Sequence, residues 1–395
     1  MNVRHIIQKS ILAAVTLLTM AGCSLMTDDL SDCPTGLYVN FVYDYNIQRA
    51  DMFKDHVGSV SLYVYDESDR LVVQRSVSGS QLAVYGFTIH FTEDELAPGH
   101  QYRLVAVGMQ KDWQEALGTP GAKYRYVAPK KGDSWKQLTV TLDHEPSADM
   151  PAHYSPVDNS APLDTLWRTL CTIENPVALQ PAATRYHELA DGSVSTNGVE
   201  RIELVKGEPA YATVSLIRDT KHLNISLREI DHPERTSHED YEVFIIDNNS
   251  TLDYQNRLIN TEDTLVYRPY AQWTTTYVIN GAAQNGEEAE EQRSAHYDLM
   301  FNRLMYSTTP KDCAVLCIRR KSDGKDIALL NLPEVLAEGR TAYEINNYRP
   351  QEYLDREYDY RLELFLKGEE WQQLAYLNIC IDVLSWAKRI QYVNF

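Results

Sequence analysis

Short segments in which apolar and polar residues alternate recur along almost the whole chain. In the first of them, Leu37, Val39 and Phe41 fall on one face. A repeat of two residues places every second side chain on the same side of an extended backbone, so each segment predicts a β-strand with one buried face. Similar segments begin at Val60, Leu138, Leu223, Leu362 and Leu377.

Helical patterns are few by comparison. One short helix is expected over Leu332–Gly339, where a proline lies near the start and a glycine at the end. Many short strands with few helices predict an all-β protein built from antiparallel β-sandwiches. The chain has 395 residues, and at roughly 100–200 residues per domain this length suggests two domains.

Two stretches have the composition of loops or linkers. Residues 144–162 contain four prolines, which a central strand does not tolerate. Residues 191–198 are small and polar, and a new strand pattern begins soon after them. We therefore expect one sandwich domain over residues 36–198 and a second over residues 199–395.

The N-terminus has the three regions of a secretory signal peptide. Arg4 and Lys9 supply positive charge, and Ile11–Met20 is an apolar segment of ten residues. Ten helical residues are too short to cross a bilayer core of roughly 30 Å, which favours a signal peptide over a membrane span. The segment ends in Met20-Ala21-Gly22-Cys23, which resembles the bacterial lipobox.

The resemblance to a lipobox implies cleavage between Gly22 and Cys23 and covalent lipid on the Cys23 thiol and amine. Residues 1–22 would then be removed, and residues 23–35 would form a short tether. Several acyl chains on one residue give lasting membrane attachment. The alternative is an ordinary signal peptide with a chance cysteine. Acidic residues follow Cys23 closely, either as a surface-export signal or as a solvated linker: Asp28, Asp29 and Asp32.

Charge and cysteine content exclude several other classes. Lys and Arg number 37 against 56 Asp and Glu, a net charge of −19, which argues against a nucleic-acid partner because phosphates require clustered basic residues. After removal of the signal peptide and lipidation of Cys23, an odd number of cysteines would remain, so they cannot all pair within the chain. These are Cys33, Cys171, Cys313, Cys317 and Cys380.

Motifs for catalysis and cofactor binding are absent from the sequence. It contains no G-x-S-x-G, no P-loop, no G-x-G-x-x-G and no H-E-x-x-H. The His and Glu residues of segment 232–240 fit a polar loop better than a metal site. Segment 247–258 resembles a calcium loop but lacks its glycine and its final glutamate. We expect no enzyme, no metal, no cofactor and no small-molecule substrate.

Several segments together resemble the FimB-type fimbrial anchor lipoproteins, which are related to fimbrillins. No single motif is specific to this family, but the order of the segments combined with the lipobox is specific. The segments are Asp32–Asn46 (DCPTGLYVNFVYDYN), Val60–Asp66 (VSLYVYD), Val214–Thr220 (VSLIRDT), Asp240–Asn249 (DYEVFIIDNN), Tyr353–Leu366 (YLDREYDYRLELFL) and Ile379–Phe395 (ICIDVLSWAKRIQYVNF).

This resemblance implies a fold, a location and a role. Members of the family have two transthyretin-like β-sandwich domains in tandem. The implied role is to hold the base of a fimbrium in the outer membrane, on the cell surface, and to limit the length of its shaft. The implied partners are a fimbrial shaft subunit and, through the lipid, the outer membrane. The alternative is a surface lipoprotein that binds glycans.

The assembly mechanism of the family can be applied to this chain. Shaft subunits are thought to lose their first strand after an arginine and to accept a strand from a neighbour. Cutting here after Arg49 would separate the lipid from the body, so we expect Arg49 to stay uncut. We expect a strand for exchange in the terminal segment, which could equally be a simple closing strand. Its candidate residues are Trp386, Ile390, Tyr392, Val393 and Phe395.

Overall fold

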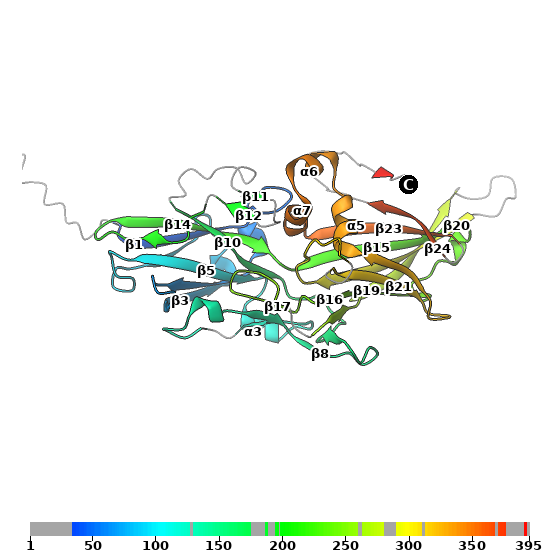
Figure 1. Ribbon diagram of the computed structural model, residues 1–395, viewed down its shortest axis with the longest axis horizontal. Helices are drawn as coiled ribbons and strands as arrows, with labels where there is room; N and C mark the ends of the chain where they lie inside the picture. The colour runs from blue at the N-terminus through cyan, green and yellow to red at the C-terminus, as the bar shows by residue number, and fades with distance from the viewer. Residues whose placement is uncertain are drawn as a thin grey trace, which may run out of the picture.

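The computed structural model describes residues 34–126, 129–174, 186–188, 194–196, 198–259, 263–279, 290–309, 313–367, 370–376 and 391–392. Strands make up nearly half of these residues and helices only a small part, and two groups of strands follow one another along the long axis of the molecule (Figure 1). The predicted all-β fold class is therefore confirmed.

The first group contains a sheet of eight strands. Its order is β3-β2-β5-β10-β14-β1-β4, with β13 also paired to β5. All of its pairs are antiparallel except β1 with β14, which run in parallel. The strands are β1 (Gly36–Val42), β2 (Ser59–Tyr65), β3 (Leu71–Ser78), β4 (Thr88–Phe91), β5 (Gln101–Met109), β10 (Leu166–Glu174), β13 (Ile202–Glu203) and β14 (Pro209–Arg218).

The second group contains two sheets of six strands, with orders β19-β20-β15-β23-β24-β25 and β22-β21-β16-β18-β9-β8. The first comprises β15 (Lys221–Glu229), β19 (Ala271–Ile279), β20 (Glu290–Phe301), β23 (Asp359–Lys367), β24 (Glu370–Tyr376) and β25 (Gln391–Tyr392). The second comprises β8 (His144–Pro146), β9 (Tyr154–Pro156), β16 (Tyr241–Asp247), β18 (Leu265–Tyr267), β21 (Val315–Arg320) and β22 (Asp326–Asn331).

Smaller elements complete the described structure. A three-stranded sheet has the order β17-β7-β6, and β11 pairs with β12. The helix α5 (Leu332–Glu338) confirms the short helix expected over Leu332–Gly339. These elements are β6 (Tyr124–Tyr126), β7 (Val140–Leu142), β11 (Tyr186–Glu188), β12 (Val194–Thr196), β17 (Thr251–Leu252), α2 (Phe53–His56), α3 (Trp113–Leu117), α5 (Leu332–Glu338), α6 (Ala342–Asn347), α7 (Pro350–Arg356), η2 (Gly79–Gln81), η3 (Trp135–Gln137) and η5 (Pro233–Arg235).

The proline-rich segment 144–162 is not wholly a loop, which corrects the expectation from sequence. It contributes β8 and β9, each of three residues, to the second six-stranded sheet. Pro146 and Pro156 end their strands, and β9 pairs with β18 through Tyr154 and Leu265 alone. Proline has no N–H to donate to a neighbouring strand. Because both prolines lie at the ends of short strands, few hydrogen bonds of the sheet are lost.

Apolar faces of the sheets form the core. In the second group, Leu223 and Ile225 of β15 belong to the same buried cluster as Val243 of β16 and Leu316 of β21, so the two six-stranded sheets pack as a sandwich. In the first group, Leu37 and other apolar residues of β1, β2, β5 and β14 form a second buried cluster. Burying such side chains contributes roughly 1.5–3 kcal/mol each.

Strand pairing crosses the domain boundary that we expect at residue 198. β13 and β14 both follow that residue, yet they pair with strands that precede it. β14 leads into β15 of the other group through Asp219 and Thr220, which are both fully buried. The boundary at residue 198 stays a prediction, and the structure adds that the two groups of strands share this short connection.

Candidate functional site

The first strand, β1, is an inner strand of its sheet. It pairs with β14 along its whole length, from Gly36–Pro209 to Val42–Ser215, and with β4 on its other side. Leu37 and Val39 are fully buried, and the ring of Phe41 stacks on Phe53 with centroids 5.5 Å apart. Removal of β1 would therefore expose both a row of backbone groups and part of the core.

Arg49 lies in a tight turn just after β1. Its N–H donates to the Asn46 carbonyl at 3.2 Å, and its φ is +55°. The buried Asn46 amide donates to the carbonyls of Tyr43 and Ala50 at 2.9 and 2.8 Å. The Arg49 guanidinium lies 4.6 Å from the ring centroid of Tyr343 in α6. Both the backbone and the side chain of this residue are thus fixed.

The C-terminal strand β25 forms the edge of its sheet. Tyr392 and Gln391 pair antiparallel with Ala375 and Tyr376 of β24. Of the residues expected to take part in exchange, the structure places the backbone of Tyr392. The other candidates lie outside the described residues: Trp386, Ile390, Val393 and Phe395.

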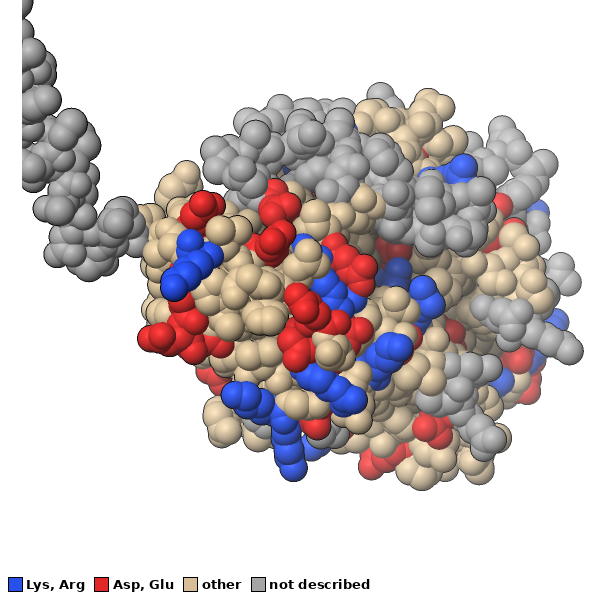
Figure 2. All heavy atoms as spheres, turned by 60° about the vertical axis from the view of Figure 1, so that its left-hand side comes forward, with Lys and Arg blue, Asp and Glu red and all other residues tan. Residues whose placement is uncertain are grey.

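The proposed lipidation and cleavage residues, Gly22 and Cys23, also lie outside the described residues. Within the described ranges, no helix has the length and apolar character needed to cross a membrane. The same ranges contain no group of three or more His, Cys, Asp or Glu side chains arranged to hold a metal ion. Acidic and basic side chains lie interspersed on the described surface in Figure 2.

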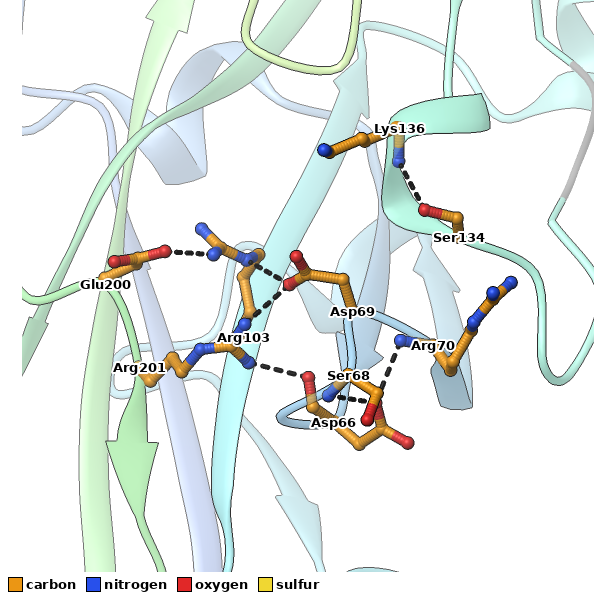
Figure 3. A network of polar contacts seen from close by, with 9 residues as sticks. All are labelled: Asp66, Ser68, Asp69, Arg70, Arg103, Ser134, Lys136, Glu200 and Arg201. Carbon is orange, nitrogen blue, oxygen red and sulfur yellow. Dashed lines mark hydrogen bonds and ion pairs between the residues drawn. The ribbon is translucent and has the colours of Figure 1, made fainter.

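A network of ion pairs lies at one end of β5 (Figure 3). Arg103 of β5 contacts Asp69 at 3.1 Å and also pairs with Glu200. Arg201 contacts the same Asp69 carboxylate at 2.6 Å and the Asp66 carbonyl at 2.6 Å. Burial raises the pKa of Asp69, but hydrogen bonds and charges of the two arginines outweigh it and hold that pKa below its usual value.

A cavity of about 360 Å³ borders this network. Residues of β5 and β10 form its floor, together with Trp135 of η3 and Tyr254 in the turn after β17. The Trp135 and Tyr254 rings meet edge to face with centroids 4.5 Å apart, and the Arg103 guanidinium lies 4.1 Å from the centroid of Trp135. These contacts fix the Trp135 ring in one orientation.

Arg168 is the buried charged residue among those that line this cavity, and sequence analysis did not select it. The side chain is 1% exposed, although it comes from β10, a strand of otherwise largely apolar or neutral residues. The only signal in the sequence is a charged residue within the strand-like segment LWRTLCTI. The sequence alone does not distinguish an arginine that lines a binding site from one that forms a salt bridge with another segment. The surroundings of the side chain decide between the two.

Comparison with known protein families gives one match over most of the chain. The model for the Fimbrillin-A associated anchor proteins Mfa1 and Mfa2 matches residues 30–392. The chain belongs to this family. Membership gives it a fimbria-associated role, in agreement with the resemblance seen in the sequence. No curated protein sequence matches the chain.

Several solved structures with the same fold come from species of Bacteroides. A candidate adhesin from Bacteroides thetaiotaomicron has a TM-score of 0.62 and 23% identity, covering 87% of this chain and 96% of its own. A candidate polysaccharide-binding protein from the same organism has a TM-score of 0.61 and 22% identity, covering 91% and 99%. A candidate adhesin from Bacteroides ovatus has a TM-score of 0.61 and 20% identity, covering 92% of this chain and 97% of its own. These similarities confirm the fold of the anchor family member.

Proposed function

We propose that this chain is a non-enzymatic outer-membrane lipoprotein that anchors the base of a fimbrium on the cell surface and limits the length of its shaft. Lipid on Cys23 holds it in the membrane through the tether of residues 23–35. The observation that carries the proposal is the position of β1, paired on both sides and buried in the sheet directly after that tether. A lipid attached before β1 is thereby connected to the folded body.

The turn around Arg49 supports an uncut chain. Proteases bind an extended, accessible backbone, and cleavage concentrates at exposed loop tips. Arg49 instead lies in a hydrogen-bonded turn, and its guanidinium is held against Tyr343. In this proposal β1 stays in its own sheet and is not replaced by a strand of a neighbouring subunit.

Contact with the shaft subunit is assigned to the C-terminal segment 386–395. The edge position of β25 supports this assignment, since an edge strand is held on one side only and can be released more readily than an inner strand. Strand exchange would supply main-chain hydrogen bonds and alternating side-chain contacts to the partner.

Mass spectrometry of N-terminal peptides from membrane-purified native protein tests the anchor. We expect acylated Cys23 on a chain that continues past Arg49. A chain that begins at Ala50 would contradict the proposal, because it would identify a processed subunit that has lost both lipid and β1.

Deletion of residues 387–395 tests the exchange segment. We expect loss of fimbrial shaft from the cell surface, with the protein still folded by circular dichroism and still in the outer membrane. A control deletes residues 281–286 from the connection between β19 and β20, which leaves four residues to join the paired ends Ile279 and Glu290. Normal shaft retention in the 387–395 deletion would leave the segment as a closing strand and refute strand donation.

A further inference from the structure

The cavity beside Arg168 has the size and lining of a small-ligand site. At about 360 Å³ it falls at the lower end of the range for ligand pockets, which suits a ligand of one sugar ring. Its lining combines aromatic rings with buried polar groups from two neighbouring strands. No step of the anchoring proposal uses this cavity.

The cavity presents hydrogen-bond donors that have no acceptor. Arg168 Nη2 donates to the Asp253 carbonyl at 3.1 Å, but its Nε and Nη1 have no hydrogen-bond partner in the part of the chain that the structure describes. Trp135 Nε1 borders the same cavity and is also buried, with no partner among the described residues. Buried donors are costly to leave unsatisfied, so a ligand rich in acceptor oxygens would be bound favourably here.

Arg168 is also a buried positive charge for which the described residues supply no ion pair. Burial lowers the pKa of its guanidinium, although the charges of Asp219 and Asp253 oppose that effect. Arg103, the other arginine of the lining, is different because it is already paired with Asp69 and Glu200. An anionic group that enters the cavity is therefore attracted to Arg168, while Arg103 shapes the wall.

We propose that this cavity binds a carboxylated monosaccharide, with its carboxylate on Arg168 and its ring beside Trp135 and Tyr254. A carboxylate provides two oxygens for the free Arg168 donors. The Trp135 N–H donates to a third oxygen of the ligand. Aromatic rings with a polar edge, such as Trp and Tyr, favour a ligand that is apolar on one side and polar on the other. A sugar acid has this character, and a simple aliphatic acid does not.

The test is calorimetric titration of the full mature chain with D-galacturonate, D-galactose and N-acetylglycine. We expect galacturonate to bind at least tenfold more tightly than either of the other two. Equal binding of galactose would overturn the role of the carboxylate. Equal binding of N-acetylglycine would overturn the saccharide class, and no binding of galacturonate would overturn the site.

Variants locate the binding. Arg168→Gln and Trp135→Phe should each weaken galacturonate binding at least tenfold, whereas Arg235→Ala, at a 70% exposed side chain in η5, should leave it unchanged. Trp135→Phe retains a ring and removes one donor, so it remains informative if Arg168→Gln does not fold. Unchanged binding in Trp135→Phe would overturn the site. Shaft retention is measured separately, so failure here does not bear on anchoring.

Discussion

Three largely buried arginines differ in the groups that lie next to their positive charge. Arg303 forms a two-pronged ion pair with Asp355, at 2.8 and 2.7 Å. Arg356 contacts Glu352 at 2.8 Å and lies 4.2 Å from the centroid of the Tyr45 ring. Among the described residues, the hydrogen-bond partner of the Arg168 guanidinium is the Asp253 carbonyl. Arg303 and Arg356 are thus each paired with a carboxylate, whereas no carboxylate of the described residues forms an ion pair with Arg168, which borders the cavity.

His222 gives a residue-scale prediction. Its Nδ1 lies 2.6 Å from Asp359, and its Nε2 lies 3.5 Å from Asp298. Burial lowers the pKa of His222, but the two carboxylates outweigh it and raise that pKa to about 9. A pKa raised above the unfolded value of about 6.5 means stability that is fully present below pH 6.5 and lost as pH rises to about 9.

Replacement of His222 with glutamine should therefore lower the free energy of unfolding by roughly 1–3 kcal/mol at pH 6 and by much less above pH 9. Urea denaturation at a series of pH values measures this difference. The control His100→Gln alters a ring that is 56% exposed beside Glu67 and should change the profile little. A His222→Gln effect that is constant across pH would contradict the assignment.

At the scale of elements, the sequence predicts strands well and their partners poorly. Alternation over Leu37–Phe41 corresponds to β1, and the segments at Val60, Leu223 and Leu362 correspond to β2, β15 and β23. The segment at Leu377 lies outside the described residues. Alternation reports which face of a strand is buried, but it carries no information about which distant strand lies alongside.

Two parallel strand pairs show why the pattern of a single strand does not identify its partner. β1 pairs with β14, and β15 pairs with β23, across very large separations in the chain. The cavity follows from the same long-range arrangement, because Trp135, Arg168 and Tyr254 come from three separate segments. The short strands β8 and β9 were missed for a different reason, since three residues are too few to display a period.

The turn after β1 gives an element-scale prediction. Replacing Tyr343, 49% exposed, with alanine removes the ring that holds the Arg49 side chain. An exposed contact between a cation and a ring stabilises by about 0.5–1 kcal/mol, so trypsin cleavage after Arg49 should become about two- to fivefold faster. Mass spectrometry of the fragment that begins at Ala50 follows the reaction.

The matched control for this experiment is Tyr277→Ala. Tyr277 lies on β19 with a similar exposure of 51%. We expect no change in cleavage after Arg49 in this variant. The fixed turn would be refuted if native protein were cut after Arg49 as fast as urea-unfolded protein.

At the scale of the molecule, a polar network surrounds the connection between the two groups of strands. Asp219, in the connection from β14 to β15, accepts from the Asn256 amide at 2.8 Å. Arg303 donates to the Asn256 carbonyl and pairs with Asp355. Lys221 Nζ donates to the Asp355 carbonyl at 2.8 Å. Asp219, Lys221 and Asp355 are at most 2% exposed, Asn256 is 6% exposed and the Arg303 side chain is 13% exposed, so these contacts are largely shielded from water.

Breaking this network should weaken both groups together. Arg303→Met leaves the buried Asp355 carboxylate without its partner, which typically costs about 3–5 kcal/mol. We expect faster hydrogen exchange in β10 and β14 as well as in β15 and β23. The exposed-pair control Arg235→Ala should cost at most about 1 kcal/mol. Faster exchange confined to β15 and β23 would show that the two groups unfold independently.

The parallel pairing of β1 and β14 has a mechanical consequence. A pull on the chain before Gly36 draws β1 toward its N-terminal end, while a pull on β15 draws β14 toward its C-terminal end. In a parallel pair these directions are opposite, so the two strands are loaded in shear. All hydrogen bonds between them then share the tension at once, whereas strands peeled apart from one end break their bonds one after another. The topology at the N-terminal end of the fold is thus suited to carrying a sustained tensile load.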